Sequence, residues 1–201
     1  MSGTHAAENH MPAVVLHDSH GRRVVAAASE LMRSLRFVFE RERADSWAPI
    51  MKSMGRACGK ALGVDEDAAL AAAGRPALAA QSLEASLAVL QSKFTEYGWG
   101  VLAVDVSGAA DFGLIIGRLE HSWFATSFAD GTFFTDPFPA GVILGYFEHI
   151  TGQVLDGAEL ACAGRGAPHC IFAVTTPDRL ALIAGAITHE SAEQLIARLK
   201  A

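Results

Sequence analysis

The stretch Glu159-Leu160-Ala161-Cys162-Ala163-Gly164-Arg165-Gly166-Ala167-Pro168-His169-Cys170 says more about the fold of this chain than any other. It places two of the three cysteines, one carboxylate and one histidine within twelve residues. The glycines and the proline supply tight turns, which bring the two ends of the stretch together. A loop that folds back with two thiols and an acid can hold a metal ion, and zinc is the metal that such ligands favour.

Three interpretations of this cluster stay open. Glu159, Cys162 and Cys170 could bind a structural zinc ion that closes the loop. The two cysteines could instead be small core residues at a strand end, with Glu159 in solvent. They could also form a reversible disulfide with each other.

The composition indicates one globular domain. The chain has 201 residues, of which 51% are hydrophobic and 19% charged, so a sizeable core can form. Residues 1–20 are polar and lack periodicity, which predicts a disordered tail before a single domain over 21–201. No run of eighteen apolar residues exists, so we expect no membrane span. The net charge of −6 argues against nucleic-acid binding, and the few cysteines favour the cytoplasm.

Hydrophobic periodicity predicts helices in the first half of the chain, over 24–43, 46–62 and 83–97. Gly55 and Gly59 lie four residues apart on the second of these helices. Because glycine weakens a helix, the pair indicates either close approach of another backbone or a loosely specified helix. The Ala-rich segment 64–80 is expected to form short helical pieces.

The pattern becomes β-like after residue 100. Segments 101–106 and 112–119 predict one antiparallel hairpin, and 154–161 and 170–174 predict a second. A turn is expected at Asp130-Gly131, a helix over 140–151 separates the hairpins, and a helical region follows Pro177. Runs of helices and hairpins, without regular β-α alternation, predict an α+β fold with an antiparallel sheet packed against a helical layer.

Aromatic residues crowd the central third of the chain, Phe133 among them. They could form the core under the sheet, or they could line a pocket for a flat apolar ligand. The candidate pocket residues are Trp99, Phe112, Trp123, Phe124, Tyr146 and His149.

Three motifs together resemble the 4-vinyl reductase domain family. The first is Met54-Gly55-Arg56-Ala57-Cys58-Gly59-Lys60, similar to the family's G-R-x-x-G helix. The second is Tyr97-Gly98-Trp99-Gly100 between a helix and a strand. The third and most specific is E-x2-C-x3-G-x3-C, beginning at Glu159.

This resemblance implies a fold related to trafficking (TRAPP) subunits and haem-nitric-oxide-binding domains, and a homodimer. It also implies binding of an aromatic, hydrocarbon or tetrapyrrole ligand. In the zinc-binding members the motif residues are ligands, which assigns a structural zinc to Glu159, Cys162 and Cys170. In the family a further cysteine usually lies on the segment that enters the helix preceding the motif, and Asp136 occupies that position here. His169 is a substitute if the loop turns inward.

We interpret the chain first as a non-catalytic module that binds or senses a small molecule. Two alternatives stay open beside this interpretation. A fainter resemblance to the non-catalytic scaffold subunit of bacterial cellulose synthase implies an assembly role. The family name implies instead a reductase acting in bacteriochlorophyll biosynthesis. The sequence has neither a G-x-G-x-x-G nor a Walker pattern, and we identify no catalytic residue. A hydride-transfer enzyme would need a cofactor fingerprint, so we favour the non-catalytic role.

Overall fold

The computed structural model describes residues 16–25, 27–43, 45–128 and 134–201. The predicted turn at Asp130-Gly131 and the aromatic residue Phe133 lie outside these ranges. The helices are α1 (Ser29–Glu42), α2 (Trp47–Ala72), α3 (Leu83–Glu96), α4 (Ala109–Phe112), α5 (Trp123–Ser127), α6 (Pro137–Thr151), α7 (Pro177–Ala181) and α8 (Ala192–Leu199). The strands are β1 (Leu16–His17), β2 (Arg23–Val24), β3 (Val101–Asp105), β4 (Ile115–Glu120), β5 (Asp156–Ala161) and β6 (Cys170–Thr175).

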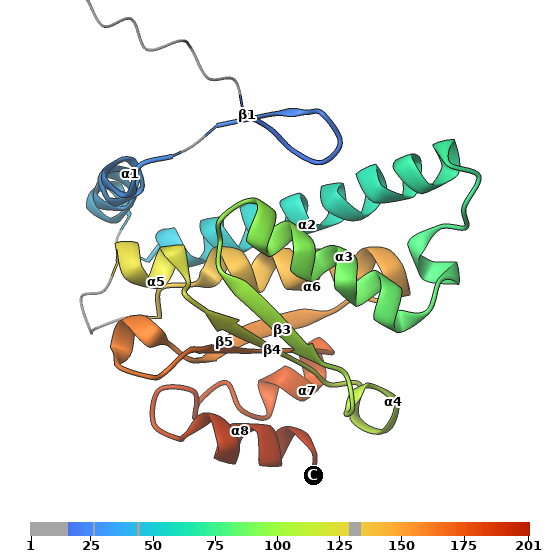
Figure 1. Cartoon of the computed structure of the whole chain (residues 1–201). Coiled ribbons are helices and arrows are strands. Elements are labelled where there is room, and N and C mark those ends of the chain that lie inside the picture. The colour runs from blue at the N-terminus through green and yellow to red at the C-terminus, as the bar shows by residue number, and fades with distance from the viewer. Residues whose placement is uncertain (1–15, 26, 44, 129–133) are drawn as a thin grey trace, which may run out of the picture.

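One four-stranded antiparallel sheet forms the centre of the molecule (Figure 1). Its strand order is β3-β4-β6-β5, so each predicted hairpin is present and the pairing of β4 with β6 joins them. The predicted α+β class and the sheet of two hairpins are therefore confirmed.

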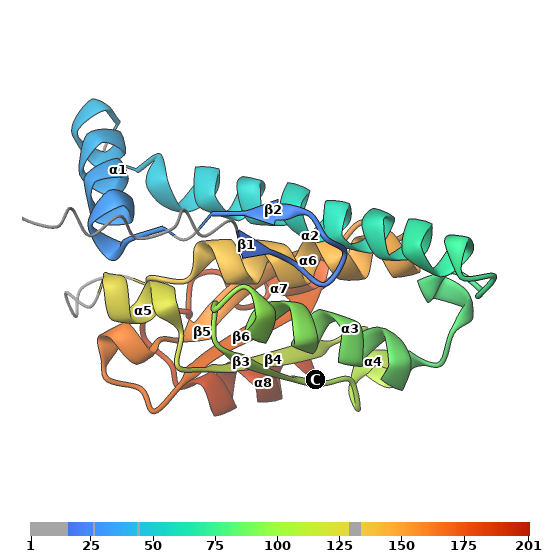
Figure 2. The ribbon, with the colours of Figure 1, turned by 45° about the horizontal axis from the view of Figure 1, so that its top comes forward.

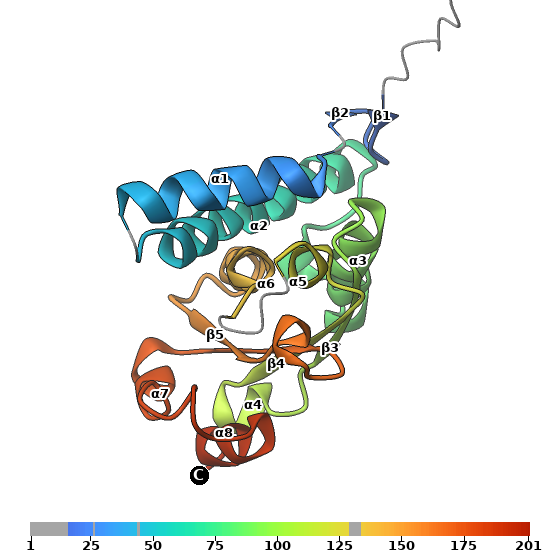
Figure 3. The ribbon, with the colours of Figure 1, turned by 90° about the vertical axis from the view of Figure 1, so that its left-hand side faces the viewer.

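Helices lie on both faces of this sheet (Figure 3). The larger layer contains α2, α3 and α6, and the core beneath it includes the fully buried Phe94, Tyr146 and Phe172. A smaller layer of α7 and α8 covers the opposite face through a second apolar cluster around Leu114 and Leu195. The sequence predicted only one helical layer, because α7 and α8 have only five and eight residues, fewer than a reading of helical periodicity requires.

Helices α2 and α6 run along each other with their backbones in contact (Figure 2). Gly55 and Gly59 on α2 face Gly141 and Gly145 on α6, and a methyl group on any of the four would overlap backbone atoms of the other helix. Only residues without a Cβ permit this separation. Of the two interpretations of Gly55 and Gly59, close backbone approach is the one that the structure supports.

An ion pair connects the same two helices. The Glu148 side chain of α6 is 3% exposed and accepts from Arg56 Nε at 2.7 Å and from Lys60 Nζ at 3.0 Å. Its second oxygen accepts from the backbone N–H of Leu155 at 3.1 Å. The arginine of the G-R-x-x-G motif thus neutralises a buried carboxylate on the partner helix.

Two regions differ most from the prediction, besides shifts of a few residues at the ends of other elements. Helix α2 continues ten residues beyond Leu62, to Ala72, because Glu66, Leu70 and the alanines from Ala68 to Ala72 are good helix formers, and the chain turns only at Gly74. Residues 16–24, expected to lie largely within a disordered tail, form the hairpin β1–β2. The Asp18 side chain fixes its turn by accepting from the backbone N–H groups of His20 and Arg22.

Helix α1 contributes no buried residue. Its Leu31, Leu35 and Val38 are 54%, 41% and 49% exposed. These residues recur at helical spacing and form an apolar stripe on the outer side of α1. Among the described residues, no helix combines the length and apolar character needed to cross a membrane.

Candidate metal centre and ligand cavity

The loop between β5 and β6 gathers the three predicted ligands. Because the strands are antiparallel, Cys162 and Cys170 return to the same end of the sheet. The turn between them is a short 3-10 segment, Ala163–Arg165, which ends at Gly166 with a φ of +91°. Donor atoms of Glu159, Cys162 and Cys170 all lie within 4.8 Å of one another, and all three residues are buried.

A local irregularity in β5 explains the E-x2-C spacing. In a regular strand, residues three apart face opposite sides of the sheet. Here the pairing register shifts between Glu159 and Ala161. Leu160 accordingly packs on the side of α8, while Cys162 packs with the core on the side of α6. The shift therefore allows Glu159 and Cys162 to meet on one side.

The segment that enters α6 completes the cluster. The Thr135 hydroxyl lies 3.0 Å from Cys162 Sγ, and the Asp136 N–H donates to Glu159 Oε2 at 3.0 Å. The Asp136 side chain is fully buried, and no described residue forms a hydrogen bond with either of its carboxylate oxygens. Glu159 Oε1 likewise has no such partner.

These observations fit a bound cation. Buried carboxylate oxygens without hydrogen bonds are costly, and a metal ion would satisfy them. The clustered donors are two thiols and the carboxylate of Glu159, which are ligands that zinc accepts, and Asp136 lies beside this group without belonging to it. The half-buried His169 does not belong to the group of clustered donors. The alternative ligand is therefore not in position.

The pKa values of Asp136, Glu159, Cys162 and Cys170 indicate that these neighbouring acidic groups have no positive charge from the described residues beside them. Burial raises the pKa of Asp136 to about 6, and burial together with the charges of Asp136 and Cys162 raises the pKa of Glu159 well above its usual range. The neighbouring Cys170 thiol lowers the pKa of Cys162, while its own pKa is raised. A Cys162 thiolate beside protonated Glu159 and Cys170 is thus favoured until a cation binds, and Asp136 is also protonated below about pH 6.

A cavity of about 440 Å³ lies beside this cluster. We call it the cluster cavity. It lies between the start of α2, the start of α6 and strand β5, and its walls are mainly apolar. The residues that line it are Ala48, Pro49, Lys52, Phe134, Pro137, Ala140, Gly157, Ala158, Glu159 and Ile187. Glu159 therefore belongs to both the cavity and the metal cluster.

The six predicted pocket residues do not line one cavity. Trp99 and Phe124 both contact Phe138, with ring centroids 5.3 and 5.2 Å apart, and Trp123 packs on Phe124 at 5.0 Å. These three belong to one aromatic cluster. None of the six lines the cluster cavity, and Trp99 lines a different cavity.

The other three lie elsewhere. Tyr146 is a core residue whose hydroxyl donates to the carbonyl of Ser86 at 2.7 Å. His149 Nε2 lies 2.8 Å from Asp67 Oδ2, on the outer part of the helical layer. Phe112 ends the short helix α4 and packs on the α8 side of the sheet, so it cannot share a pocket with the others.

Sequence reasoning missed the small residues that make the cluster cavity. Ala140, Gly157 and Ala158 leave space where larger side chains would fill it. An aromatic search cannot find such positions, although glycine inside a strand is a signal for an open or closely approached site. It also missed Thr135, whose contact with Cys162 arises only from the fold.

The fold defines this chain as an α+β domain with the architecture of vinyl-4-reductase proteins and of a phenol sensor. The phenol-responsive sensory domain of the transcription activator PoxR, solved with phenol, superposes with a TM-score of 0.58 at 18% identity, covering 90% of this chain and 85% of that one. A vinyl-4-reductase family protein from Methanocaldococcus jannaschii gives 0.51 at 15% identity, covering 76% and 83%.

A trafficking protein particle complex subunit 3 from Naegleria fowleri, covalently bound to palmitic acid, gives a TM-score of 0.49 at 13% identity, covering 73% of this chain and 93% of that one. No protein-family model matches the sequence, and no curated protein is significantly similar to it. The expected fold resemblance is confirmed by structure alone.

Proposed function

We propose that this domain is a non-catalytic module that binds or senses a small, predominantly apolar molecule in the cluster cavity. The observation that supports this most is the position of Glu159, which borders both the cavity and the buried metal cluster. A cavity of about 440 Å³ lies within the usual range for small-molecule sites. A neighbour with the same fold is a phenol-responsive sensory domain.

The metal in this proposal is a structural zinc ion. Glu159, Cys162 and Cys170 would hold it, with Asp136 as the fourth ligand. The ion would supply positive charge and fix the β5–β6 loop against the start of α6. A ligand in the cluster cavity would then contact a wall that the metal keeps in place. Because the thiols must stay reduced to bind, we also place the protein in the cytoplasm.

Metal analysis tests the zinc assignment. Protein purified under reducing conditions without chelators should contain about one zinc per chain. Cys170→Ser should lose the metal and about 3 kcal/mol of stability or more, since structural zinc contributes folding free energy. Cys58→Ser, at a half-buried cysteine outside the cluster, is the matched control and should keep the metal. Zinc far below stoichiometry in the unaltered protein would refute the assignment.

Calorimetric titration with phenol and naphthalene tests the ligand assignment. Ala48→Phe places a ring at the mouth of the cluster cavity from an exposed position, so it should abolish binding without removing the metal. Binding of neither compound to the unaltered, metal-loaded protein would count against a small aromatic ligand. Unchanged binding to the variant would place the ligand elsewhere.

We further propose a homodimer in which a second copy covers the apolar stripe of α1. Leu31, Leu35 and Val38 are exposed on one side of this helix, and such stripes normally pack against a partner. Light scattering should give twice the chain mass, and Leu35→Glu should convert the protein to monomer. A monomer at all concentrations of the unaltered protein would disprove the dimer.

A further inference from the structure

The N-terminal hairpin β1–β2 covers a second cavity, separate from the cluster cavity. This hairpin cavity has a volume of about 650 Å³ and lies between the hairpin, α2 and the end of α3. Its apolar lining includes Leu16 and Val24 from the hairpin, Cys58, Ala61 and Leu62 from α2, and Trp99. The volume suits a drug-sized molecule.

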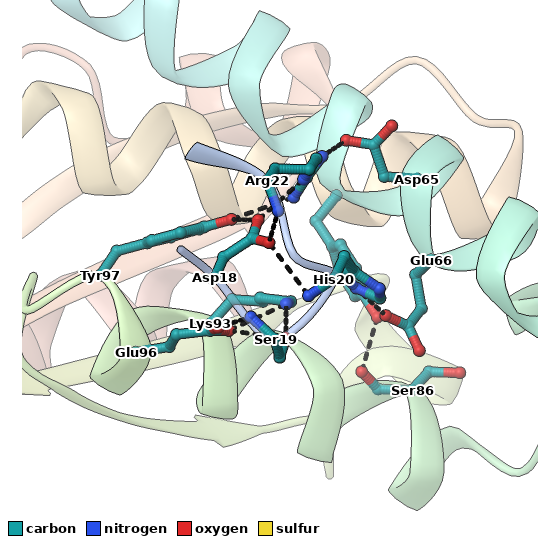
Figure 4. Close-up of polar contacts among 11 residues, drawn as sticks. Asp18, Ser19, His20, Arg22, Asp65, Glu66, Ser86, Lys93, Glu96 and Tyr97 are labelled. Carbon is teal, nitrogen blue, oxygen red and sulfur yellow. Dashed lines mark hydrogen bonds and ion pairs between the residues drawn. The ribbon is translucent and has the colours of Figure 1, made fainter. Parts of the chain in front are cut away.

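Polar contacts hold the hairpin in place (Figure 4). Asp18 is 8% exposed and its Oδ2 accepts from Arg22 Nε at 2.7 Å and from the Tyr97 hydroxyl at 3.0 Å. Arg22 also donates to Tyr97 and to Asp65 of α2. From the turn of the hairpin, His20 Nε2 lies 3.1 Å from Oε2 of Glu66, the residue after Asp65.

A second set of polar contacts connects the hairpin to α3. The Ser19 hydroxyl donates to Glu96 Oε2 at 3.1 Å, and Lys93 Nζ lies 2.6 Å from the same hydroxyl. The apolar residues of the hairpin belong to none of the core clusters formed by the described residues. A two-stranded hairpin is marginally stable alone, so this one can open at low cost while the body stays folded.

The charged side chains around the hairpin cavity indicate the charge of the ligand that it can bind. Three carboxylates, from Asp18, Asp65 and Glu96, and two guanidinium groups, from Arg22 and Arg23, line it. Four of these five groups contact one another or neighbouring polar groups, and Arg23 is exposed to solvent. An anion would meet an excess of carboxylates, and a buried charged group would have to break existing pairs. A neutral molecule avoids both costs.

We propose that the hairpin cavity is a second small-molecule site, that it takes a neutral and largely apolar molecule, and that residues 16–25 form the flap that closes over it. Three observations support the proposal. The cavity has an apolar lining, most of the charged groups around it are paired, and the hairpin that covers it is attached through polar side chains. This site is independent of the metal cluster and of the cluster cavity.

The experiment compares two dyes that share a ring system. N-phenylnaphthylamine is neutral, and anilinonaphthalene sulfonate carries one negative charge. Titrated into the full chain, the neutral dye should bind with at least about tenfold higher affinity, because the sulfonate meets the carboxylates. Equal affinities, or tighter binding of the sulfonate, would overturn the assignment of a neutral ligand.

Two alanines on the exposed side of α2 give a matched pair of variants. Ala61 lines the hairpin cavity, and the exposed Ala71 lines neither the hairpin cavity nor the cluster cavity. Ala61→Phe should weaken binding of the neutral dye by at least about tenfold through loss of space, and Ala71→Phe should leave it unchanged. The reverse pattern, or no effect of Ala61→Phe, would overturn the location.

Alkylation of Cys58 gives a second measurement on the unaltered protein, so the test does not depend on the folding of a variant. Cys58 is half-buried and lines the hairpin cavity, whereas Cys162 and Cys170 are buried. The neutral dye at saturation should slow alkylation of Cys58 at least about fivefold by excluding the reagent. An unchanged rate at saturating dye would show that the dye binds elsewhere and would refute the site.

Discussion

The two long sides of α2 are closed in opposite ways. On one side, glycines bring its backbone against α6, and the buried Glu148 ties the helices together. On the other, the β1–β2 hairpin is attached by polar side chains and leaves the hairpin cavity beneath it. Backbone contact leaves no room and cannot be adjusted, whereas contact through side chains leaves space for a ligand and can open.

The largest expected effect is on the α6 side. Gly59→Leu should cost about 4 kcal/mol or more, or prevent folding, because the new side chain overlaps the backbone of α6 and neither helix can move without opening the core. Chemical denaturation measures the change. Gly185→Leu is the control, since nothing lies within 4 Å of a Cβ there, and it should change stability by less than about 0.5 kcal/mol. If Gly59→Leu were as stable as the unaltered protein, the contrast between the two sides of α2 would be wrong.

The buried ion pair on the same side should give the next effect. Glu148→Ala removes the acceptor of Arg56, Lys60 and the Leu155 N–H, and should cost about 2 kcal/mol. The cost stays moderate because the two cations are half-exposed and can turn to solvent. Glu190→Ala breaks an exposed pair with Arg198 and should cost less than about 1 kcal/mol. Equal costs in thermal unfolding would mean that burial of Glu148 contributes little.

Acidification should act on the hairpin and on the metal cluster with opposite signs. Burial opposes ionisation of Asp18 and Glu96, but hydrogen bonds from Arg22 and Lys93 lower both pKa values. Their stabilisation is therefore present above about pH 4 and lost as the pH falls through the lowered values. Without metal, the raised pKa values of Asp136 and Glu159 stabilise the fold at low pH; the Asp136 term is lost as the pH rises through about 6, and the Glu159 term as the pH rises through its own raised pKa. These two carboxyls outweigh the opposite term from the lowered pKa of Cys162.

Hydrogen exchange across a pH series in chelator measures both regions, after correction for intrinsic exchange rates. Protection of residues 16–25 should persist from pH 7 to 5 and fall below about pH 4. Protection around β5 and β6 should instead increase between pH 7 and 5. Loss of hairpin protection near pH 6 would show that other groups hold it. With zinc bound, the β5–β6 trend should reverse, because binding requires deprotonated ligands.

The smallest effect concerns the two tyrosines. Tyr97→Phe removes the hydroxyl that contacts Asp18 and Arg22, and should lower global stability by about 0.5 kcal/mol while raising exchange of residues 16–25. Tyr146→Phe removes a buried hydroxyl from the core, and should lower global stability by about 1 kcal/mol without a specific effect on the hairpin. Equal hairpin exchange in the two variants would show that Tyr97 does not hold the flap.

Local patterns predicted most of the secondary structure. Ser82 begins α3 and its hydroxyl accepts from the Ala85 N–H, and Gly152 ends α6 with a φ of +66°. Such signals are local and can be read from neighbouring residues. The prediction failed for the β1–β2 hairpin, because two-residue strands have no periodicity and their anchors, Tyr97 and Asp65, are distant in sequence.

The sequence by itself determined the α+β class, the two hairpins of the sheet and the return of Cys162 and Cys170 to one end of it, because short spacing and antiparallel pairing fix these within one loop. Only the tertiary structure decided that Asp136 lies beside Glu159 and that the register shift in β5 places Glu159 and Cys162 on one side. It also decided where space remains. A cavity remains where side chains from segments distant in sequence leave space unfilled, and the pattern of neighbouring residues does not show where that happens.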